Sequence, residues 1–260
     1  MRVVGISSIT DPSRGGADSV SRTRPRCPGG MVVAWAVLQR RNRVVLPATL
    51  LAGGVGGVIG FAVLARKVRR HQTRHLDGTV RKAVPKRHRR ATRIAAESIT
   101  PLGKWYGHMS LAALAAAATW RSRGPRAAIP AASASAAAAS LAWLLERVMR
   151  QRTPPPGRHS PTEPSFPSGH ALQTGAVAWA TAYVLVREGL ASPARAVPVA
   201  VVFPAVSGLA KLWLDRHWFT DVVAGYLLGG AIAASSAAAY ELARPRRRPR
   251  LSHAILRLAR

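Results

Sequence analysis

The stretch that decides the fold is residues 44–65, VVLPATLLAGGVGGVIGFAVLA, which carries no charged side chain and is followed by Arg66 and Lys67. An α-helix rises about 1.5 Å per residue, so roughly 20 apolar residues cross a hydrocarbon core about 30 Å thick. We therefore predict a transmembrane helix here. Its several glycines form a small-residue face, which predicts close packing against another helix rather than a chemical role.

The alternation of apolar stretches and charge continues along the chain. Five further stretches with almost no charge follow, at residues 107–120, 127–145, 171–186, 196–210 and 222–243. The first two are rich in alanine, which favours membrane insertion less than leucine, and the short RSRGPR between them predicts a helical hairpin. The predicted fold class is all-α: a polytopic membrane helix bundle with about six transmembrane helices.

The net charge of +29 comes from 39 Lys and Arg against 10 Asp and Glu, and the excess lies in blocks between the apolar stretches. A nucleic-acid binder could use such charge on phosphate backbones. Uncharged stretches of about 20 residues are not typical of that class, whereas basic flanks are typical of membrane spans. We predict a membrane protein with no nucleic-acid partner. Cys27 is the only cysteine, so no intramolecular disulfide can form.

Composition also predicts how the chain is divided. Four segments are expected: a disordered basic tail (1–43), a first span with a basic connector (44–94), a helical core (95–243) and a basic tail (244–260). Residues 66–94 lack a wide apolar face, so we predict a surface segment there. No signal peptide is evident, and either Met1 or Met31 could be the start residue.

Three polar clusters interrupt the apolar pattern after residue 145, each at the end of a predicted span. Ionisable side chains near membrane depth are costly, so such clusters indicate a functional site. The first is ERVMRQRTPPPGRH, whose arginines are Arg147, Arg150, Arg152 and Arg158. Guanidinium groups can donate paired hydrogen bonds to a phosphate. The alternative for each arginine is an ordinary basic flank of a span.

The second cluster is FPSGH, residues 166–170, between a proline-rich run and an apolar stretch. Pro167 and Gly169 predict a turn into the next helix. Unpaired backbone N–H groups at a helix start, together with the Ser168 hydroxyl, can hold an anion. His170 would stand at the mouth of that helix.

The third cluster is KLWLDRHWFTD, residues 211–221, which contains Lys211, His217 and Asp221. On a helix, residues four apart share a face, so the Asp221 carboxylate could hold one ring nitrogen of His217. The other nitrogen would then point outward as a nucleophile or base. Any one of the three clusters alone is weak evidence, and their order along the chain is what carries the prediction.

In that order the clusters resemble the type 2 phosphatidic acid phosphatase superfamily. Its members share a six-helix membrane core and the motifs Lys-x6-Arg-Pro, Pro-Ser-Gly-His and Ser-Arg-x5-His-x3-Asp. The second motif is complete here in residues 167–170. The third keeps its histidine and aspartate, with Lys211 in place of arginine and Ala210 in place of serine. The resemblance covers roughly residues 95–243.

The first motif departs furthest from the family, and two registers compete for it. If Arg152 is the family arginine, the lysine position falls on Leu145 and the proline position on Thr153. If Arg147 stands for the lysine, the arginine position falls on Pro154. Neither register keeps both cations.

The resemblance implies a phosphatase that acts on a lipid phosphate and needs no metal or other cofactor. His217 would attack phosphorus to form a phosphohistidine, Asp221 would orient its ring, and protonated His170 would donate to the leaving group. The phosphate oxygens would be held by the remaining site residues: Lys211, Ser168, Gly169, Arg147, Arg150 and Arg152.

The motifs do not distinguish polyprenyl diphosphate, phosphatidic acid and phosphatidylglycerol phosphate as substrate, and we favour the first weakly. Because the phosphate-holding positions depart from the family, a catalytically weak relative that binds anionic lipid head groups is the alternative. Vanadate-dependent haloperoxidases share such a site, but they are soluble.

The expected location is the cell membrane, multi-pass, with the site on the outer face as in the family. The positive-inside rule would place both the basic N-terminus and residues 66–94 inside, although they flank a single predicted span. Orientation and oligomeric state therefore stay open.

Overall fold

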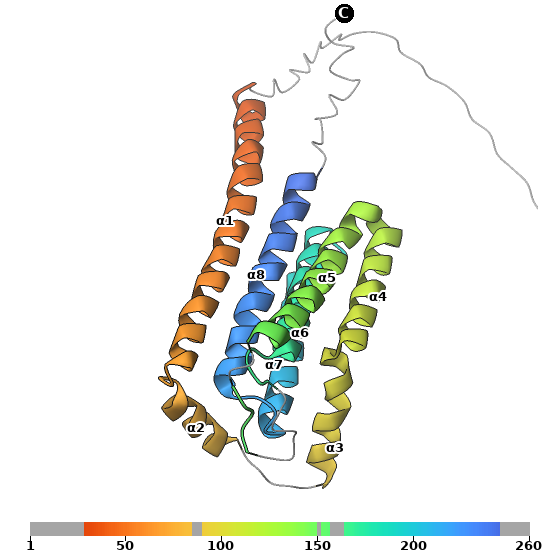
Figure 1. The fold of residues 1–260 in the computed structure, drawn as a ribbon. Coiled ribbons are helices and arrows are strands. Elements are labelled where there is room, and N and C mark those ends of the chain that lie inside the picture. The colour runs from red at the N-terminus through yellow and green to blue at the C-terminus, as the bar shows by residue number, and fades with distance from the viewer. Residues whose placement is uncertain (1–28, 85–89, 150–151, 157–163, 245–260) are drawn as a thin grey trace, which may run out of the picture. The chain divides into compact units, whose positions relative to one another are not determined.

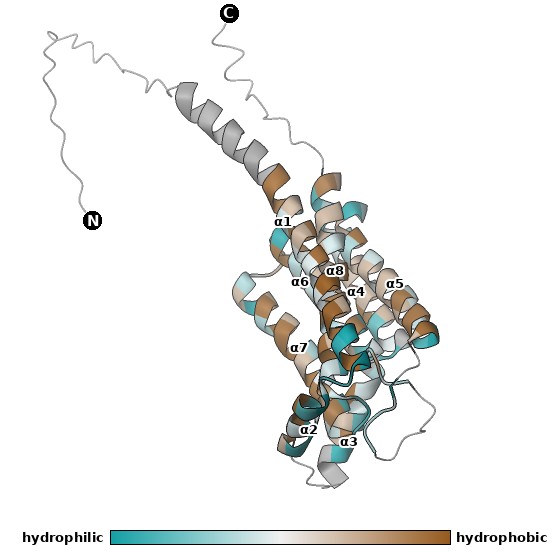
Figure 2. Ribbon diagram, turned by 60° about the vertical axis from the view of Figure 1, so that its left-hand side comes forward, coloured by the Kyte–Doolittle hydropathy of each residue, from teal (hydrophilic) through white to brown (hydrophobic). Residues whose placement is uncertain are grey.

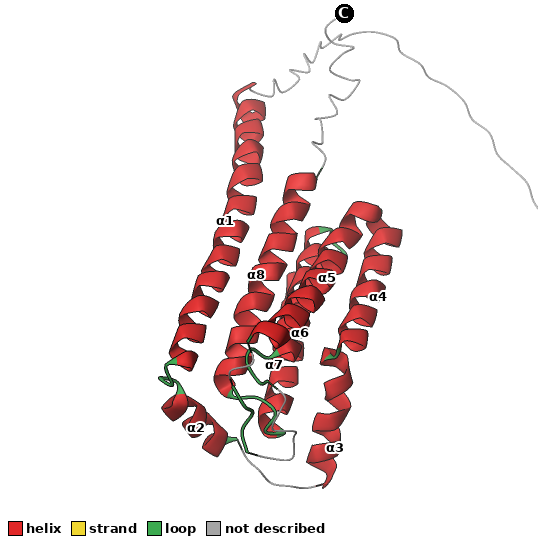
Figure 3. Cartoon of the chain, in the orientation of Figure 1, coloured by secondary structure: helices red, strands yellow, loops and turns green. Residues whose placement is uncertain are grey.

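The structure, a computed structural model, describes residues 29–84, 90–149, 152–156 and 164–244, and they are helical with no strand (Figures 1 and 3). This confirms the all-α class. The helices are α1 (Gly29–Arg69), α2 (Arg74–Ala83), α3 (Arg90–Ile99), the 3-10 helix η1 (Thr100–Gly103), α4 (Trp105–Arg123), α5 (Pro125–Val148), α6 (Gly169–Arg187), α7 (Pro193–Trp213) and α8 (Phe219–Ala243). Residues 40–260 form one compact unit, and the description below concerns that unit.

Each of the six predicted spans lies inside one of these helices. Four described helices are long and apolar enough to cross a membrane: Val44–Arg69 within α1, together with α5, α7 and α8. The prediction of about six spans is thus supported by length and composition for four. α4 carries His108 near its start and Arg121 and Arg123 at its end, which lower its mean hydropathy, and α6 carries Gln173 and Thr174 in its first turns. Figure 2 shows hydrophobic residues along the long helices and hydrophilic ones gathered near α2 and the adjoining loops.

Two boundaries differ from the prediction. α1 already begins at Gly29, so residues 29–43, predicted as part of a disordered tail, are helical. Residues 31–43 contain neither glycine nor proline, and their Ala, Leu, Gln and Arg residues are good helix formers, so nothing ends a helix there. The connector also differs, because most of it is helical, as α2 and the start of α3. Residues 1–28 and the tail after Arg244 lie outside the described residues.

The predicted helical hairpin is confirmed in α4 and α5, which pack along each other. Gly124 joins them with φ of +88°, a backbone conformation that side chains with a Cβ rarely adopt. Its N–H caps α4 by donating to the carbonyl of Trp120 at 2.7 Å. The reversal therefore depends on one glycine between two arginine-rich helix ends.

The most extensive helix contact joins α6 and α8. Two glycines one turn apart on α8 allow it, since a Cβ at Gly225 would lie 2.5 Å from the carbonyl oxygen of Ser168. A Cβ at Gly229 would lie 2.7 Å from the carbonyl oxygen of Leu172. Small residues let helix backbones approach closely in membranes, where dispersion replaces the hydrophobic effect as the source of packing energy. The start of α6 is thereby held against the start of α8.

Three of the five glycines in residues 44–65 have the predicted packing role, because Gly54, Gly57 and Gly60 lie against α8. A Cβ at Gly57 would lie 2.7 Å from the carbonyl oxygen of Leu227 on α8. By contrast, Gly53 and Gly56 have nothing within 4 Å of the position of a Cβ. α8 thus receives close backbone contacts from both α6 and α1.

Replacing Gly225 with alanine should destabilise the bundle, because the new methyl group would collide with backbone atoms that cannot move aside. Overpacking of this kind costs about 1–3 kcal/mol. Gly53→Ala is the matched control, since it adds the same methyl group to a helix in open space. Denaturant unfolding in detergent micelles measures both, and equal stability of the two variants would contradict the close approach of α6 and α8.

Candidate active site

The second and third predicted motifs meet at one end of the bundle, where the loops before α6 and α8 lie beside α2 (Figure 3). The backbone N–H of Ser168 donates to the carbonyl of Asp221 at 3.0 Å. This bond ties the Pro-Ser-Gly-His turn to the first turn of α8. The bond thus brings together two residues that are 53 positions apart in the sequence.

His217 is oriented by a backbone carbonyl. Its Nδ1 lies 2.8 Å from the carbonyl oxygen of Ser165. A carbonyl can only accept a hydrogen bond, so Nδ1 carries the proton and the ring lone pair is on Nε2. This differs from the prediction that Asp221 holds the ring, because its Oδ2 lies 3.9 Å from Nδ1. The physical reason is that α8 begins at Phe219, so His217 precedes the helix and shares no helical face with Asp221.

Asp221 acts instead as the cap of α8 and as a buried counter-ion. Its Oδ2 accepts from the backbone N–H of Trp218 at 2.8 Å, and its Oδ1 accepts from Nη1 of Arg152 at 2.7 Å. The side chain is fully buried. A carboxylate 3.9 Å from Nδ1 still favours the positively charged form of the His217 ring, so Asp221 can stabilise that charge.

Lys211 and His217 lie close enough to His170 to interact with it electrostatically. Lys211 is only 1% exposed, and its Nζ donates to Oγ1 of Thr100 at 3.4 Å. His170, which precedes the apolar stretch beginning at Ala171, has its Nε2 buried with no hydrogen-bond partner among the described residues. Burial, and then the charges of Lys211 and His217, lower the pKa of His170 to about 3. The imidazole is therefore neutral until an anion comes near it.

Ser168 and Gly169 form the start of α6, as the turn predicts. The Ser168 side chain is fully buried and caps the helix, with its Oγ accepting from the N–H of Ala171 at 3.4 Å. The hydroxyl hydrogen remains available as a donor. A Cβ at Gly169 would lie 3.5 Å from Oε1 of Glu146, which is an ordinary contact. Its backbone N–H belongs to the positively polarised end of the helix.

The arginines of the first cluster separate from one another. Arg147 is exposed, lies 3.6 Å from the ring centroid of Trp143 and donates to the Trp143 carbonyl. Among the described residues it contacts no other predicted site residue, so the structure does not bring it to the site. The reason is that Arg147 lies four residues after Trp143 on α5, so an exposed aromatic face is its nearest partner. Arg150 lies outside the described residues.

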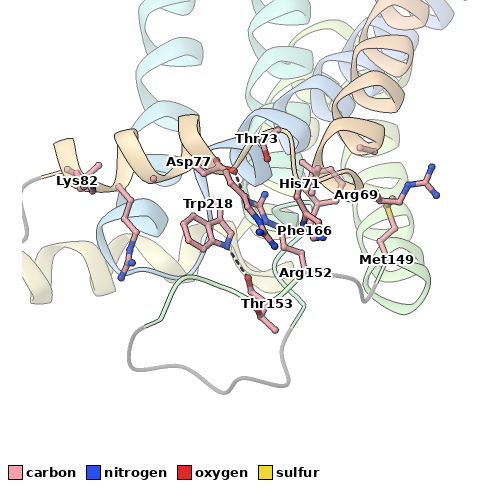
Figure 4. A pocket seen from close by; sticks show the side chains of 16 residues that line it. Arg69, His71, Thr73, Asp77, Lys82, Met149, Arg152, Thr153, Phe166 and Trp218 are labelled. Atoms are coloured by element: carbon pink, nitrogen blue, oxygen red, sulfur yellow. Dashed lines mark hydrogen bonds and ion pairs between the residues drawn. The ribbon is translucent and has the colours of Figure 1, made fainter.

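Arg152 is at the site but is bound between two carboxylates. Its Nη1 donates to Asp221 and, at 2.7 Å, to Oγ1 of Thr220, while its Nη2 donates to Oδ2 of Asp77 at 2.5 Å (Figure 4). Only 16% of its side chain is exposed. Arg152 therefore supports the site through Asp221. This placement favours the register in which Arg152, rather than Arg147, belongs to the first motif, with Leu145 packed in the apolar core.

With this geometry in view, the chain was compared with known proteins. Residues 148–245 match the model of the PAP2 superfamily. The PAP2 segment runs from the last residue of α5 to just beyond α8, so it contains both well-kept motifs. The predicted family resemblance is thereby confirmed.

A solved structure with a PAP2 fold is also similar: the crystal structure of the first transmembrane PAP2 type phosphatidylglycerolphosphate phosphatase from Bacillus subtilis. The two chains share 22% sequence identity with a TM-score of 0.63, over 75% of this chain and 98% of that one. At this identity the likeness shows the fold. The search of curated proteins found no match.

Asp77, on α2, lies outside the PAP2 segment and is a site residue that the sequence reasoning missed. It is 1% exposed, and its Oδ1 accepts from the backbone N–H of Thr220 at 2.9 Å. Most of α2 is exposed, as predicted for a surface segment, but the Asp77 side chain is buried. One signal could have found it, because Asp77 is the single acid in the basic stretch 66–94. A single carboxylate among so many basic residues suggests that its side chain turns inward to bind a partner.

A second contact of α2 reaches the loop before α8. Arg81, one turn after Asp77, donates to Oδ1 of Asp215 at 2.9 Å and to the carbonyl of Pro156 at 2.8 Å. Asp215 has φ of +53° in the turn that ends α7. α2 thus contacts the chain on both sides of His217.

The described residues contain no group of three or more His, Cys, Asp or Glu side chains that could hold a metal ion. The cations gathered around His170 and His217 instead suit an anion.

Removing Asp77 should destabilise the protein, because Asp77→Ala leaves a largely buried Arg152 with one carboxylate in place of two. Breaking a buried ion pair from one side costs about 3–5 kcal/mol. Glu97→Ala is the control, since Glu97 pairs with Arg93 at the exposed surface of α3, where such pairs contribute about 0–1 kcal/mol. Unfolding in detergent compares the two. A similar loss in both variants would show that the α2 contact is dispensable.

Proposed function

We propose that this protein is a membrane phosphatase that hydrolyses a lipid phosphate or diphosphate through a phosphohistidine. The observation that carries the proposal is the buried Nε2 of His170, near Lys211 and His217, which has no hydrogen-bond partner among the residues that the structure describes. An unsatisfied buried donor or acceptor costs free energy, so its persistence points to a ligand. A phosphate would satisfy it and would bind the cations around it.

The chemistry follows from the proton positions. Because Nδ1 of His217 donates to Ser165, its Nε2 is the nucleophile and forms the bond to phosphorus. The bond from phosphorus to the leaving oxygen breaks, and that oxygen takes a proton from His170. The phosphate anion raises the low pKa of His170, so the proton is held when substrate is bound. Water then gives a proton to His170 and attacks phosphorus, the bond from phosphorus to Nε2 of His217 breaks, and inorganic phosphate is released.

The phosphate oxygens are held by fewer cations than the sequence suggests. Lys211, the N–H groups at the start of α6 and the hydroxyl of Ser168 are the donors near His170. Arg152 assists indirectly, by holding Asp221 near the His217 ring. Arg147 takes no part in this proposal.

The apolar helices support a lipid as the substrate. We propose the polyprenyl diphosphate or phosphatidic acid class, and the similar solved structure adds phosphatidylglycerolphosphate as a candidate, since that protein is a phosphatase named for it. No described side chain chooses among these lipids.

A phosphate-release assay on purified protein, with a panel of these lipids, tests the proposal. His217→Ala should lower kcat by at least about a thousandfold, which is the scale seen when a nucleophile or base is removed from other hydrolases. The matched control is His75→Ala, an exposed histidine of α2. Activity should survive excess chelator. Turnover by His217→Ala at the wild-type rate would overturn the mechanism.

A second candidate function is a weak or inactive relative that binds anionic lipid head groups. One observation favours it, because Arg152 is engaged by Asp77 and Asp221 and Arg147 is held on Trp143. The same panel separates the two functions. Binding of the lipids without phosphate release from any of them would support this candidate.

We propose that the site faces the outside of the cell, as the family resemblance implies. Basic side chains do not decide this, because they occur near α2 at the site end and near Gly124 at the other end. The test is a single-cysteine protein, Thr153→Cys in a Cys27→Ser background, labelled in intact cells. Thr153 is exposed at the site end, so a membrane-impermeant thiol reagent should label it. Protection until the cells are opened would place the site inside.

A further inference from the structure

A cavity of about 1050 Å³ lies between the last turns of α1, helix α2 and the loop after α5 (Figure 4). Its lining does not include Lys211, His170 or His217. Arg152 and Trp218, which both bind Asp221, line this cavity. The cavity therefore adjoins the candidate active site without including its histidines.

The lining of the cavity is strongly cationic. Five Arg or Lys side chains line it: Arg69, Arg74, Arg81, Lys82 and Arg152. The one carboxylate in the lining is Asp77, which is already bound to Arg152 and Thr220. No carboxylate of the described residues pairs with Arg69, Arg74 or Lys82. Three cations at this cavity thus lack a counter-ion within the described part of the chain.

One face of α2 presents two of these cations. Arg74, Gly78 and Lys82 are spaced four residues apart, so they form a stripe on the helix. A Cβ at Gly78 would meet nothing within 4 Å, which leaves the space between the two cations open. The stripe therefore presents two basic side chains on either side of an open position.

The opposite wall is apolar and continues onto the membrane-facing surface of α1. It is formed by Ala65, Val68, Met149 and Phe166. Further along α1, Val55, Ile59 and Val63 are more than half exposed, as side chains that face lipid would be. The candidate span ends at Arg69 with three basic residues in its last turn, so the cavity lies at the depth where head groups meet acyl chains.

We propose that this cavity binds an anionic membrane lipid, with its phosphodiester between Arg74 and Lys82 and its chains along the end of α1. Basic pockets beside apolar helices suit such head groups because charge attraction and acyl burial act together. The ligand is a lipid bound beside the active site and not the molecule being hydrolysed. The proposal does not depend on the proposed phosphatase activity.

Native mass spectrometry of the purified full chain in detergent tests this binding directly. The probes are dioleoyl phosphatidylglycerol and, as the zwitterionic comparison, dioleoyl phosphatidylcholine. Wild-type protein should retain phosphatidylglycerol preferentially. In R74Q/K82Q its affinity should fall about 25-fold, because each basic residue near an anionic head group contributes roughly a factor of five.

Two further variants control for charge and for folding. R121Q/R123Q removes the same charge from exposed positions at the other end of the bundle and should leave retention unchanged. Gly78→Trp fills the gap without altering charge and should abolish retention, while normal unfolding in detergent would show that this variant is intact. Equal losses in the two charge variants would overturn the proposal. Displacement of the lipid by an equal concentration of soluble glycerol phosphate would also overturn it, by showing a site for free phosphate only.

Discussion

The site depends first on how closely α6 and α8 approach each other. Gly225 lies against the Ser168 carbonyl, so the two helix starts meet backbone to backbone, with no side chain between them. Two polarised helix ends then point toward the same region, where His170 and His217 lie. In a membrane, where burial of apolar surface contributes little to helix association, such contact is one of the main sources of specificity. Because Gly225 and Gly229 have no side chains, the starts of α6 and α8 come close enough to bring the two histidines into one site.

Charge balance is the second constraint. The end of the bundle that contains the site is rich in cations, and two buried carboxylates, Asp77 and Asp221, offset one of them, Arg152. Lys211 lies further in and has only the hydroxyl of Thr100 as a neighbour in the described hydrogen bonds. Arg152 is therefore neutralised by its two carboxylates, whereas Lys211 keeps its charge beside His170. Of these two cations, only Lys211 remains to attract an anion to the histidines.

Much of this arrangement could be predicted from the sequence. Long apolar stretches predict the helices, and the residues of a contiguous motif stay together however the helices pack. The six helices that contain the predicted spans, the α4–α5 reversal and the Pro-Ser-Gly-His turn were accessible in this way. The role of Ser165 was not, because it acts through its carbonyl, which every residue has. Arg147 and Arg152 looked alike in the sequence, and only the direction of each side chain distinguishes them. Asp77 was hidden because its partners lie 75 and 143 positions further along the chain.

That last separation has a consequence for the order in which the protein is made. Asp77 leaves the ribosome before either of its partners exists, and α8 is the last helix of the described chain. Until α8 is in place, the Asp77 carboxylate has neither the Thr220 amide nor the complete charge balance around Arg152, and it must remain hydrated. The polar support of the site is thus completed only once α8 has been made, and a nascent chain that ends at His217 carries both histidines without it.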